Sequence, residues 1–279
     1  MKKIKFDYVI CTIFSLIFLL PLVFIFTNSF MNDFDIFDNY MRKIEDGYTY
    51  LRLIPNRITF HQYYDLLFKS QDFINSFWNS VIITSTICIL NLFFSYYVSY
   101  ALFRLENKLS RVIYYFYMLV ALMPYQVMCV PNFIIINKLN LMNTYLALIL
   151  PAIFNPIGVF LLKEFLNFVP KSYIESAKID GASEFSIATN ILMPIMKKWL
   201  VIITLINFAN YWNMVEEAII FINDNAKQPL SLVLSYISKE NISILFSGSV
   251  LYIIPAILLF IEQKNYIVDF WRQRFQHCK

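Results

Sequence analysis

Six apolar stretches constrain this chain of 279 residues more than any other feature, because each is long enough to cross a lipid bilayer. A spanning helix needs about 20 apolar residues, since the hydrocarbon core is about 30 Å thick and a helix rises about 1.5 Å per residue. The pattern therefore predicts an all-α membrane protein with six transmembrane helices. The stretches are residues 8–26, 77–103, 112–136, 145–162, 200–222 and 242–261.

The overall composition excludes a soluble domain. Hydrophobic residues make up 59% of the chain and charged residues 15%, whereas soluble domains carry about 25% charged residues. A soluble domain of this size would expose a large apolar patch. The net charge of +4 does not indicate nucleic-acid binding, because the basic residues lie between the apolar stretches. Prolines inside or beside several stretches predict kinks, which membrane helices tolerate.

The distribution of Lys and Arg predicts which connections face the cytoplasm. Fifteen of these residues fall on one side and eight on the other. The richer side includes both ends of the chain, which agrees with an even number of spans, so we expect both termini to be cytoplasmic. The first stretch follows a basic segment, as in a signal peptide, but no small-x-small cleavage site follows it. We therefore expect a retained first span.

These assignments divide the chain into four parts. Residues 1–30 hold the N-terminal tail and the first transmembrane helix, and residues 31–72 form an extracytoplasmic segment without an assigned role. Residues 73–268 form a core of five helices, and residues 269–279 form a cytoplasmic tail. Within the core, the polar stretch KSYIESAKIDGASEFSIATNILMP at 171–194 fills most of the longest inner connection.

The polar stretch predicts two short helices joined by a turn. Ser172 is followed three residues later by Glu175, which is the spacing of a capping box at a helix start. Gly181 suits the left-handed backbone that closes a helix, and Ser183 suits the cap of a second helix. The apolar face of the first helix is expected to comprise Tyr173, Ile174 and Ala177.

Two interpretations of this stretch differ in what it faces. In the first it is an ordinary solvated connector, whose cap would contribute about 1 kcal/mol. That explains why a helix forms, but not why the connection runs over residues 163–199, because helix connections usually span about 2–8 residues. In the second interpretation the stretch is a docking surface for a cytoplasmic partner, which accounts for its length.

The stretch resembles the EAA motif of permease subunits of ATP-binding-cassette (ABC) importers. That motif reads Glu-Ala-Ala, three residues, Gly, nine residues, Ile-x-Leu-Pro. Ser176 stands at the second position and Met193 at the position of the Leu. The matching residues are Glu175, Ala177, Gly181, Ile191 and Pro194. The run Asp180, Gly181, Ala182 and Ser183 is similar to the sugar-importer branch.

Other segments resemble the same branch, so the likeness covers about residues 73–268 and the first span. They are FINSFWNSVIIT at 73–84, YALFRLENK at 100–108, MPYQVMCVPNF at 123–133, NLMNTYLALILP at 140–151 and FANYWNMVEEAIIF at 208–221. Two departures are Met214, where the family usually has Glu, and the tail at 265–279, which lacks the family's glycine-rich end.

The resemblance implies a maltose-permease-like subunit with the type I importer (MetI-like) fold, in a bacterial plasma (inner) membrane. It implies a carbohydrate as solute, and a second permease, two cytoplasmic ATPase subunits and an external solute-binding protein as partners, with membrane lipid but no nucleic acid. This chain would bind no cofactor, because the ATPases use the ATP and Mg²⁺. The ATPase-coupling interface would comprise Glu175, Ser176, Ala177, Asp180, Gly181, Ala182, Ser183 and Pro194.

The chemistry-bearing residues argue against an enzyme. The four glycines form no G-x-x-x-x-G-K-[ST] phosphate loop, so this chain is not expected to hydrolyse ATP. His61 lies in the outer segment and His277 in the tail, so they do not suggest a nucleophile or metal cluster. Cysteines 11, 88, 129 and 278 have no zinc or disulfide spacing. We expect no catalytic residues and no metal site.

Polar residues of the fifth span are candidates for lining a solute pathway. Asn207, Asn210 and Asn213 recur every three residues, so they share a helix face that is expected to point into the bundle. Glu216 and Glu217 follow, and acidic residues inside a membrane usually face a cavity or a partner. For these two we weigh a structural or interface role, solute contact and proton relay. Aromatic residues of the second span suit either packing or a sugar path: Tyr96, Tyr97 and Tyr100.

Three alternatives stay open at this point. The importer could carry a different solute, such as a modified sugar or a small peptide. The chain could instead be a secondary, ion-coupled transporter that uses Glu216 and Glu217, although such proteins usually show inverted repeats and none is evident here. It could also be a membrane-anchored scaffold whose inner helices recruit a partner without transport.

Overall fold

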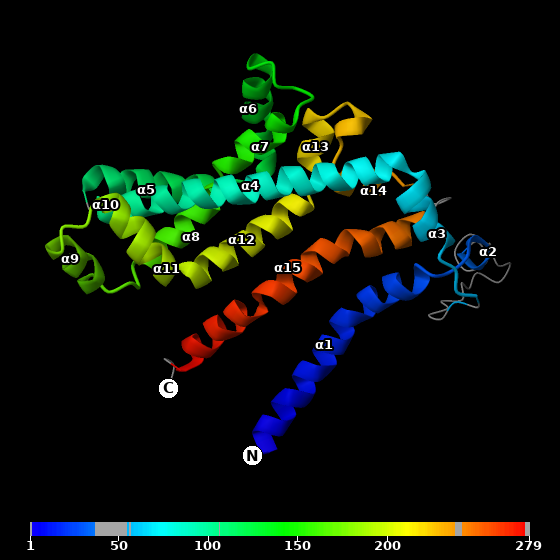
Figure 1. Ribbon diagram of the computed structural model, residues 1–279, viewed down its shortest axis with the longest axis horizontal. Helices are drawn as coiled ribbons and strands as arrows, with labels where there is room; N and C mark the ends of the chain where they lie inside the picture. The colour runs from blue at the N-terminus through cyan, green and yellow to red at the C-terminus, as the bar shows by residue number, and fades with distance from the viewer. Residues whose placement is uncertain (1, 37–54, 56, 106, 238–241, 277–279) are drawn as a thin grey trace. The chain divides into compact units, whose positions relative to one another are not determined.

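The computed structural model describes residues 2–36, 55, 57–105, 107–237 and 242–276 (Figure 1). Within this part of the chain the regular structure is helical, and strand pairing is limited to one isolated bridge between Met31 and Ile58. The all-α prediction is confirmed. The α-helices are α1 (Lys2–Asn28), α2 (Asp33–Ile36), α3 (His61–Tyr64), α4 (Gln71–Arg104), α5 (Lys108–Ala121), α6 (Tyr125–Lys138), α7 (Tyr145–Ile153), α8 (Pro156–Leu166), α9 (Ser172–Ile179), α10 (Glu184–Ser186), α11 (Met193–Ile195), α12 (Lys197–Trp212), α13 (Glu216–Phe221), α14 (Leu230–Ser235) and α15 (Ile242–Gln276). Two π-helical segments, η2 (Asp65–Lys69) and η3 (Ile187–Leu192), and one 3₁₀ turn, η4 (Asn225–Lys227), complete the order.

The described residues contain four helices long and apolar enough to cross a membrane on their own. They are Val9–Asn28, Gln71–Arg104, Tyr145–Leu166 and Ile242–Lys264, which match four of the six stretches. The number rises to six if each of two bent helix pairs is one span. Six spans and cytoplasmic termini therefore stay predictions, while a multi-pass membrane chain is supported.

The third stretch, 112–136, is not one straight helix. It divides into α5 and α6, which meet at an angle of 104°. Pro124 precedes α6 in an extended conformation, with φ −62° and ψ 145°. A proline disfavours helical backbone in the residue before it, so α5 ends short of Met123. The fifth stretch also differs from its expected bounds of 200–222, because α12 ends at Trp212 and a bend of 79° separates it from Glu184–Ile195.

The chain forms two compact units, and the first comprises residues 1–77 and 233–255. In this unit the described part of the outer segment folds back on the end of α1. The Gln62 side chain donates to the Met31 carbonyl at 2.7 Å, and the Tyr63 hydroxyl donates to Ser29 Oγ at 2.7 Å. Residues 37–54 and 56 of the 31–72 segment lie outside the described residues.

The second unit comprises residues 78–232 and 256–279, and a buried polar network ties three of its helices together. The carbonyl of Ala152 has no donor at residue 156, because Pro156 has no N–H, and it accepts instead from the Asn155 N–H and the Tyr211 hydroxyl, each at 3.2 Å. The Asn91 side chain of α4 donates to the carbonyls of Ala152 and Ile153, at 3.1 and 2.9 Å. Asn207 of α12 in turn donates to Asn91 Oδ1 at 2.7 Å, and both asparagines are buried.

Replacing Asn91 with leucine is expected to lower the stability of the protein by about 1–2 kcal/mol, because the Ile153 carbonyl and the Asn207 amide lose their partner and the Ala152 carbonyl loses one of its donors. Thermal unfolding in detergent should show a fall in melting temperature of about 5 °C. Asn137→Leu, at an exposed position of α6, is the matched control. A melting temperature unchanged from wild type would show that the network contributes nothing.

Candidate functional site

The polar stretch begins with α9, which turns one residue earlier than the sequence pattern predicts. Lys171 has helical backbone, and the Ile174 N–H donates to the Lys171 carbonyl at 3.0 Å. Ser172 therefore lies inside the helix, where its carbonyl accepts from Ser176 Oγ at 2.8 Å. The predicted capping box between Ser172 and Glu175 is wrong. Tyr173 is exposed, so the inner face consists of Ile174 and Ala177 alone.

A glycine turn closes α9, as predicted. Gly181 has φ +80°, in the left-handed region that side chains disfavour. Its N–H donates to the Lys178 carbonyl at 3.0 Å, and the Ala182 N–H donates to the Ala177 carbonyl at 2.9 Å. This pair of bonds is the Schellman arrangement, which satisfies the last carbonyls of the helix. A Cβ at position 181 would meet nothing within 4 Å, so the glycine is needed for its backbone angle and not for space inside the chain.

The second short helix, α10, starts where the sequence predicts, because Ser183 Oγ accepts from the Ser186 N–H at 3.2 Å. The next residue, Glu184, is the centre of an ionic cluster. Its two carboxylate oxygens accept from Arg104 of α4, at 2.8 and 3.0 Å, and from the Tyr100 hydroxyl at 2.5 Å. Lys178 of α9 lies 3.1 Å from the same carboxylate. We call these four residues the Glu184 cluster.

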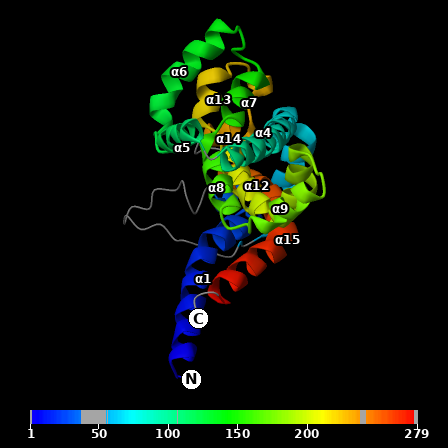
Figure 2. The ribbon, with the colours of Figure 1, turned by 90° about the vertical axis from the view of Figure 1, so that its left-hand side faces the viewer.

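Three residues of α4 hold the stretch along one face of that helix. Tyr96, Tyr100 and Arg104 are spaced four residues apart and therefore project from the same side. The buried Tyr96 hydroxyl donates to the Ala188 carbonyl in η3 at 2.5 Å. Figures 1 and 2 show α9 and α10 beside the C-terminal end of α4. Tyr96 and Tyr100 thus have packing roles. The spacing was visible in the sequence, but nothing there identified Glu184 as its partner.

The outer side of the stretch combines exposed polar and apolar residues. Ile179 is 87% exposed and Phe185 is 68% exposed, beside the exposed glycine turn. Large apolar side chains on an otherwise polar connection suit a protein partner better than water. We call Tyr173, Ile179 and Phe185 the apolar rim. Of the eight residues expected to form the coupling interface, Ala177 is buried and Ala182 partly buried, and six are exposed: Glu175, Ser176, Asp180, Gly181, Ser183 and Pro194.

A cavity of about 630 Å³ opens between the middle helices of the second unit. Asn210 and Glu217 line it, as do Tyr125 and Asn132 of α6 and Asn155 before α8. The Tyr125 hydroxyl is buried, with the Cys129 thiol one helical turn away beside it. None of the side chains that line the cavity is basic.

The structure separates the five residues expected to line a pathway. Asn210 and Glu217 reach the cavity together. Asn207 belongs to the Asn91 network, and the exposed Asn213 side chain donates to the Ala209 carbonyl at 2.7 Å. Glu216 is exposed at the start of α13. Tyr125 and Asn132, which sequence reasoning did not single out, lie across the cavity on a different helix.

Among the described residues, no three His, Cys, Asp or Glu side chains come together as a metal site would require. His61 pairs with Asp65 at 3.0 Å. His277 and Cys278 lie outside the described residues.

Comparisons with known proteins agree with this architecture. Residues 91–267 match the family described as binding-protein-dependent transport system inner membrane component. The chain is 30% identical over 217 residues to an arabinooligosaccharides transport system permease protein of Halalkalibacterium halodurans, covering 77% of this chain and 78% of the relative. The fold resembles a chain of a bacterial ABC transporter that imports the acidic polysaccharide alginate, with a TM-score of 0.78, 22% identity, and coverage of 94% of this chain and 95% of that one. A second chain, from an alginate ABC transporter in complex with an alginate pentasaccharide-bound periplasmic protein, matches with a TM-score of 0.65 at 13% identity, covering 94% of each.

Proposed function

Because the chain belongs to the family of binding-protein-dependent transport system inner membrane components, we propose that residues 171–194 are the surface through which a cytoplasmic ATPase drives this permease. The chain is the permease subunit of an ABC importer. The observation that carries the proposal is the pairing of an exposed apolar rim with a rigid attachment to α4 through the Glu184 cluster.

Rigidity matters because the ATPase must bias the whole transmembrane part. Moving a two-state equilibrium from 1:99 to 99:1 takes about 5.5 kcal/mol of differential binding. If residues 171–194 moved independently of α4, the free energy of ATPase binding would displace only those residues and not the transmembrane helices. Here Glu184 and Ala188 are bonded to Tyr96, Tyr100 and Arg104, so a displacement of the rim is passed to a helix of 34 residues.

The cavity supports a neutral oligosaccharide as the solute. Amide, hydroxyl and carboxylate groups at Asn132, Tyr125 and Glu217 suit sugar hydroxyls, which both donate and accept hydrogen bonds. The absence of basic side chains from its lining disfavours an acidic sugar, because a uronate carboxylate would enter a cavity without a cation to pair with it. The permease relative named for arabinooligosaccharides supports the same class.

The proposed assembly contains a second permease subunit, two ATPase subunits that use ATP and Mg²⁺, and an external solute-binding protein. The last is supported by the fold relative whose complex includes a periplasmic protein carrying an alginate pentasaccharide. We place the chain in a bacterial plasma membrane with six spans and residues 171–194 on the cytoplasmic side, on the distribution of Lys and Arg.

Uptake of labelled arabino-oligosaccharide by cells expressing the complete transporter tests the proposal. Depleting ATP while an ion gradient is maintained should stop uptake, and collapsing the gradient while ATP is maintained should not. The reverse pattern would favour the ion-coupled alternative. An alginate oligosaccharide serves as the acidic comparison, and its uptake at the same rate as the neutral sugar would contradict the neutral-sugar assignment.

Replacing Glu217 with glutamine is expected to raise the apparent KM for arabino-oligosaccharide about threefold to tenfold, because a sugar hydroxyl loses a charged acceptor. The dependence on ATP should be unchanged. Glu216→Gln is the matched control, since Glu216 is the adjacent acid and does not line the cavity. If the two substitutions changed the apparent KM equally, the assignment of Glu217 as a solute contact would be wrong.

A further inference from the structure

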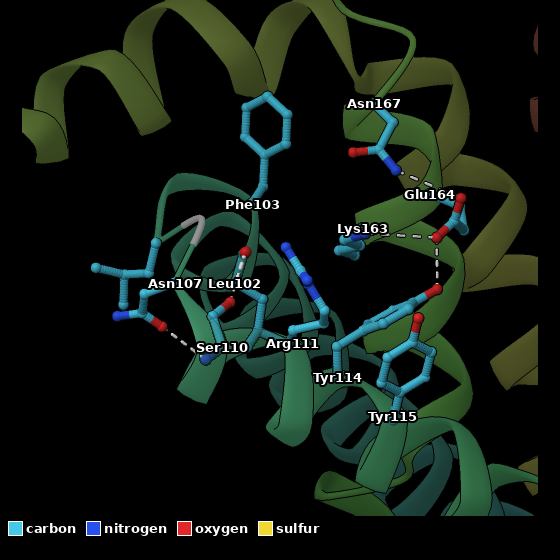
Figure 3. A pocket seen from close by; sticks show the side chains of 11 residues that line it. Leu102, Phe103, Asn107, Ser110, Arg111, Tyr114, Tyr115, Lys163, Glu164 and Asn167 are labelled. Carbon is cyan, nitrogen blue, oxygen red and sulfur yellow. Dashed lines mark hydrogen bonds and ion pairs between the residues drawn. The ribbon is translucent and has the colours of Figure 1, made fainter.

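A second cavity of about 450 Å³ lies where the end of α4, the start of α5 and the end of α8 meet (Figure 3). It shares no lining residue with the cavity of about 630 Å³ and none with residues 171–194. Its polar lining includes Arg111 and Tyr114 of α5 and Lys163 and Glu164 of α8, with Asn167 just beyond. Neither the transport role nor the ATPase docking role uses these side chains.

Glu164 is the acidic side chain among the described residues of this lining, and its two oxygens already accept hydrogen bonds. Oε1 accepts from the Tyr114 hydroxyl at 2.5 Å and lies 3.6 Å from Lys163 Nζ, while Oε2 accepts from Asn167 at 3.4 Å. Lys163 also lies over the Tyr114 ring, 4.2 Å from its centre. The charge of Glu164 is therefore compensated within the cavity.

Lys163 lies beside Glu164, which leaves Arg111 as the other basic side chain among the described lining residues. Among the residues that the structure describes, no ion pair or side-chain hydrogen bond involves its guanidinium. In Figure 3 this side chain extends from α5 into the space beside Leu102 and Lys163. A guanidinium has five N–H donors in a planar fork that fits two oxygens of a phosphate. Among the described residues that line the cavity, two basic side chains therefore face one carboxylate, and Arg111 offers a bidentate donor.

The surroundings indicate where the phosphate comes from. On its outward side α5 exposes Leu109, Val112 and Phe116, an apolar face next to the cavity. A free inorganic phosphate would gain nothing from that face, whereas a phospholipid could place its acyl chains along it and its headgroup in the cavity. Basic pockets at the cytoplasmic ends of transmembrane helices bind anionic headgroups in this way. We propose that Arg111, beside the Lys163–Glu164 pair, binds the phosphate of an anionic phospholipid of the cytoplasmic leaflet, a leaflet assignment that rests on the orientation proposed above.

Native mass spectrometry of the full-length chain in detergent, titrated with phosphatidylglycerol or phosphatidylcholine, tests this site. The wild type should retain phosphatidylglycerol in preference to phosphatidylcholine, and Arg111→Gln should bind it about tenfold more weakly, as expected for the loss of one bidentate charged contact. Arg111→Lys keeps the charge without the fork and should recover part of the affinity. Lys108→Gln is the control, because it removes one charge from the same turn of α5 outside the cavity.

Equal retention of phosphatidylglycerol by wild type and Arg111→Gln, with both proteins equally stable to heat, would overturn the proposal. Retention of phosphatidylcholine as well as phosphatidylglycerol would also overturn it. In a third measurement, millimolar inorganic phosphate is added to the protein with bound phosphatidylglycerol. Displacement of the phosphatidylglycerol by phosphate would assign the site to a soluble anion instead. The assay measures no transport, so its outcome is independent of the test of the proposed function.

Discussion

Replacement of Gly181 with valine is expected to lower ATP-driven uptake about thirtyfold while the chain still inserts in the membrane. The backbone at this position has φ +80°, where a residue with a Cβ is strained by about 1–2 kcal/mol. Relieving that strain would break the bonds from Gly181 and Ala182 to the end of α9, at about 1 kcal/mol each. Either outcome costs about 2 kcal/mol, which corresponds to about a thirtyfold change in an equilibrium constant.

A second substitution at this position, Gly181→Asn, separates the effect of the backbone angle from that of the space a side chain needs. Asparagine tolerates left-handed backbone better than most residues, so Gly181→Asn should keep the turn. Since a Cβ meets nothing within 4 Å in this chain, failure of Gly181→Asn to bind the ATPase would locate the obstruction on the partner's surface. Co-purification with the ATPase and solute uptake are the two measurements. Normal uptake by Gly181→Val would count strongly against docking through this turn.

Replacement of Glu184 with alanine is expected to uncouple the transporter, lowering the amount of solute imported per ATP hydrolysed about tenfold. This change removes the bonds to Arg104 and Tyr100 and the ion pair to Lys178 at once. The carboxylate is half exposed, so each contact alone contributes about 1 kcal/mol or less. Their joint loss would loosen the attachment of α10 to α4, which then rests on the Tyr100 hydroxyl at the Glu184 carbonyl and on the Phe185 ring against Tyr97. A loss of about 1.4 kcal/mol already corresponds to a tenfold change.

The expected phenotype differs from that of the glycine variant, because the apolar rim stays in place and the ATPase should still bind. Lys178→Ala removes one contact and serves as the graded control, with a smaller effect expected. The exchange Arg104→Glu with Glu184→Arg should restore part of the coupling, since it rebuilds an ion pair between the same helices. An unchanged ratio of import to hydrolysis in Glu184→Ala would exclude this cluster from transmission.

The turn at Gly181 and the cap at Ser183 could be predicted because each depends on a few neighbouring residues. A left-handed angle favours glycine wherever it occurs, and a serine side chain caps the N–H three residues ahead. The capping box at Ser172 was a similar local pattern and was wrong, because the preceding Lys171 already has helical backbone. Local patterns at helix starts compete with one another, and packing of Ile174 and Ala177 selects the outcome.

The asparagine spacing of the fifth span shows where this kind of inference stops. A three-residue period predicts that Asn207, Asn210 and Asn213 share a face, but not what each one meets. Asn207 meets Asn91, which is 116 positions away in the chain, while Asn210 reaches the cavity. The partners belong to helices whose arrangement no local pattern encodes.

Sequence alone determined the membrane class, four of the predicted spans and the glycine turn, because apolar length and allowed backbone angles are properties of short segments. Tertiary structure decided the rest. The attachment of residues 171–194 to Arg104 and Tyr100 and the cavity around Glu217 depend on contacts between segments far apart in the chain. The angle of 104° between α5 and α6 also depends on tertiary structure. Pro124 ends a helix locally, but only packing sets the direction of the next helix.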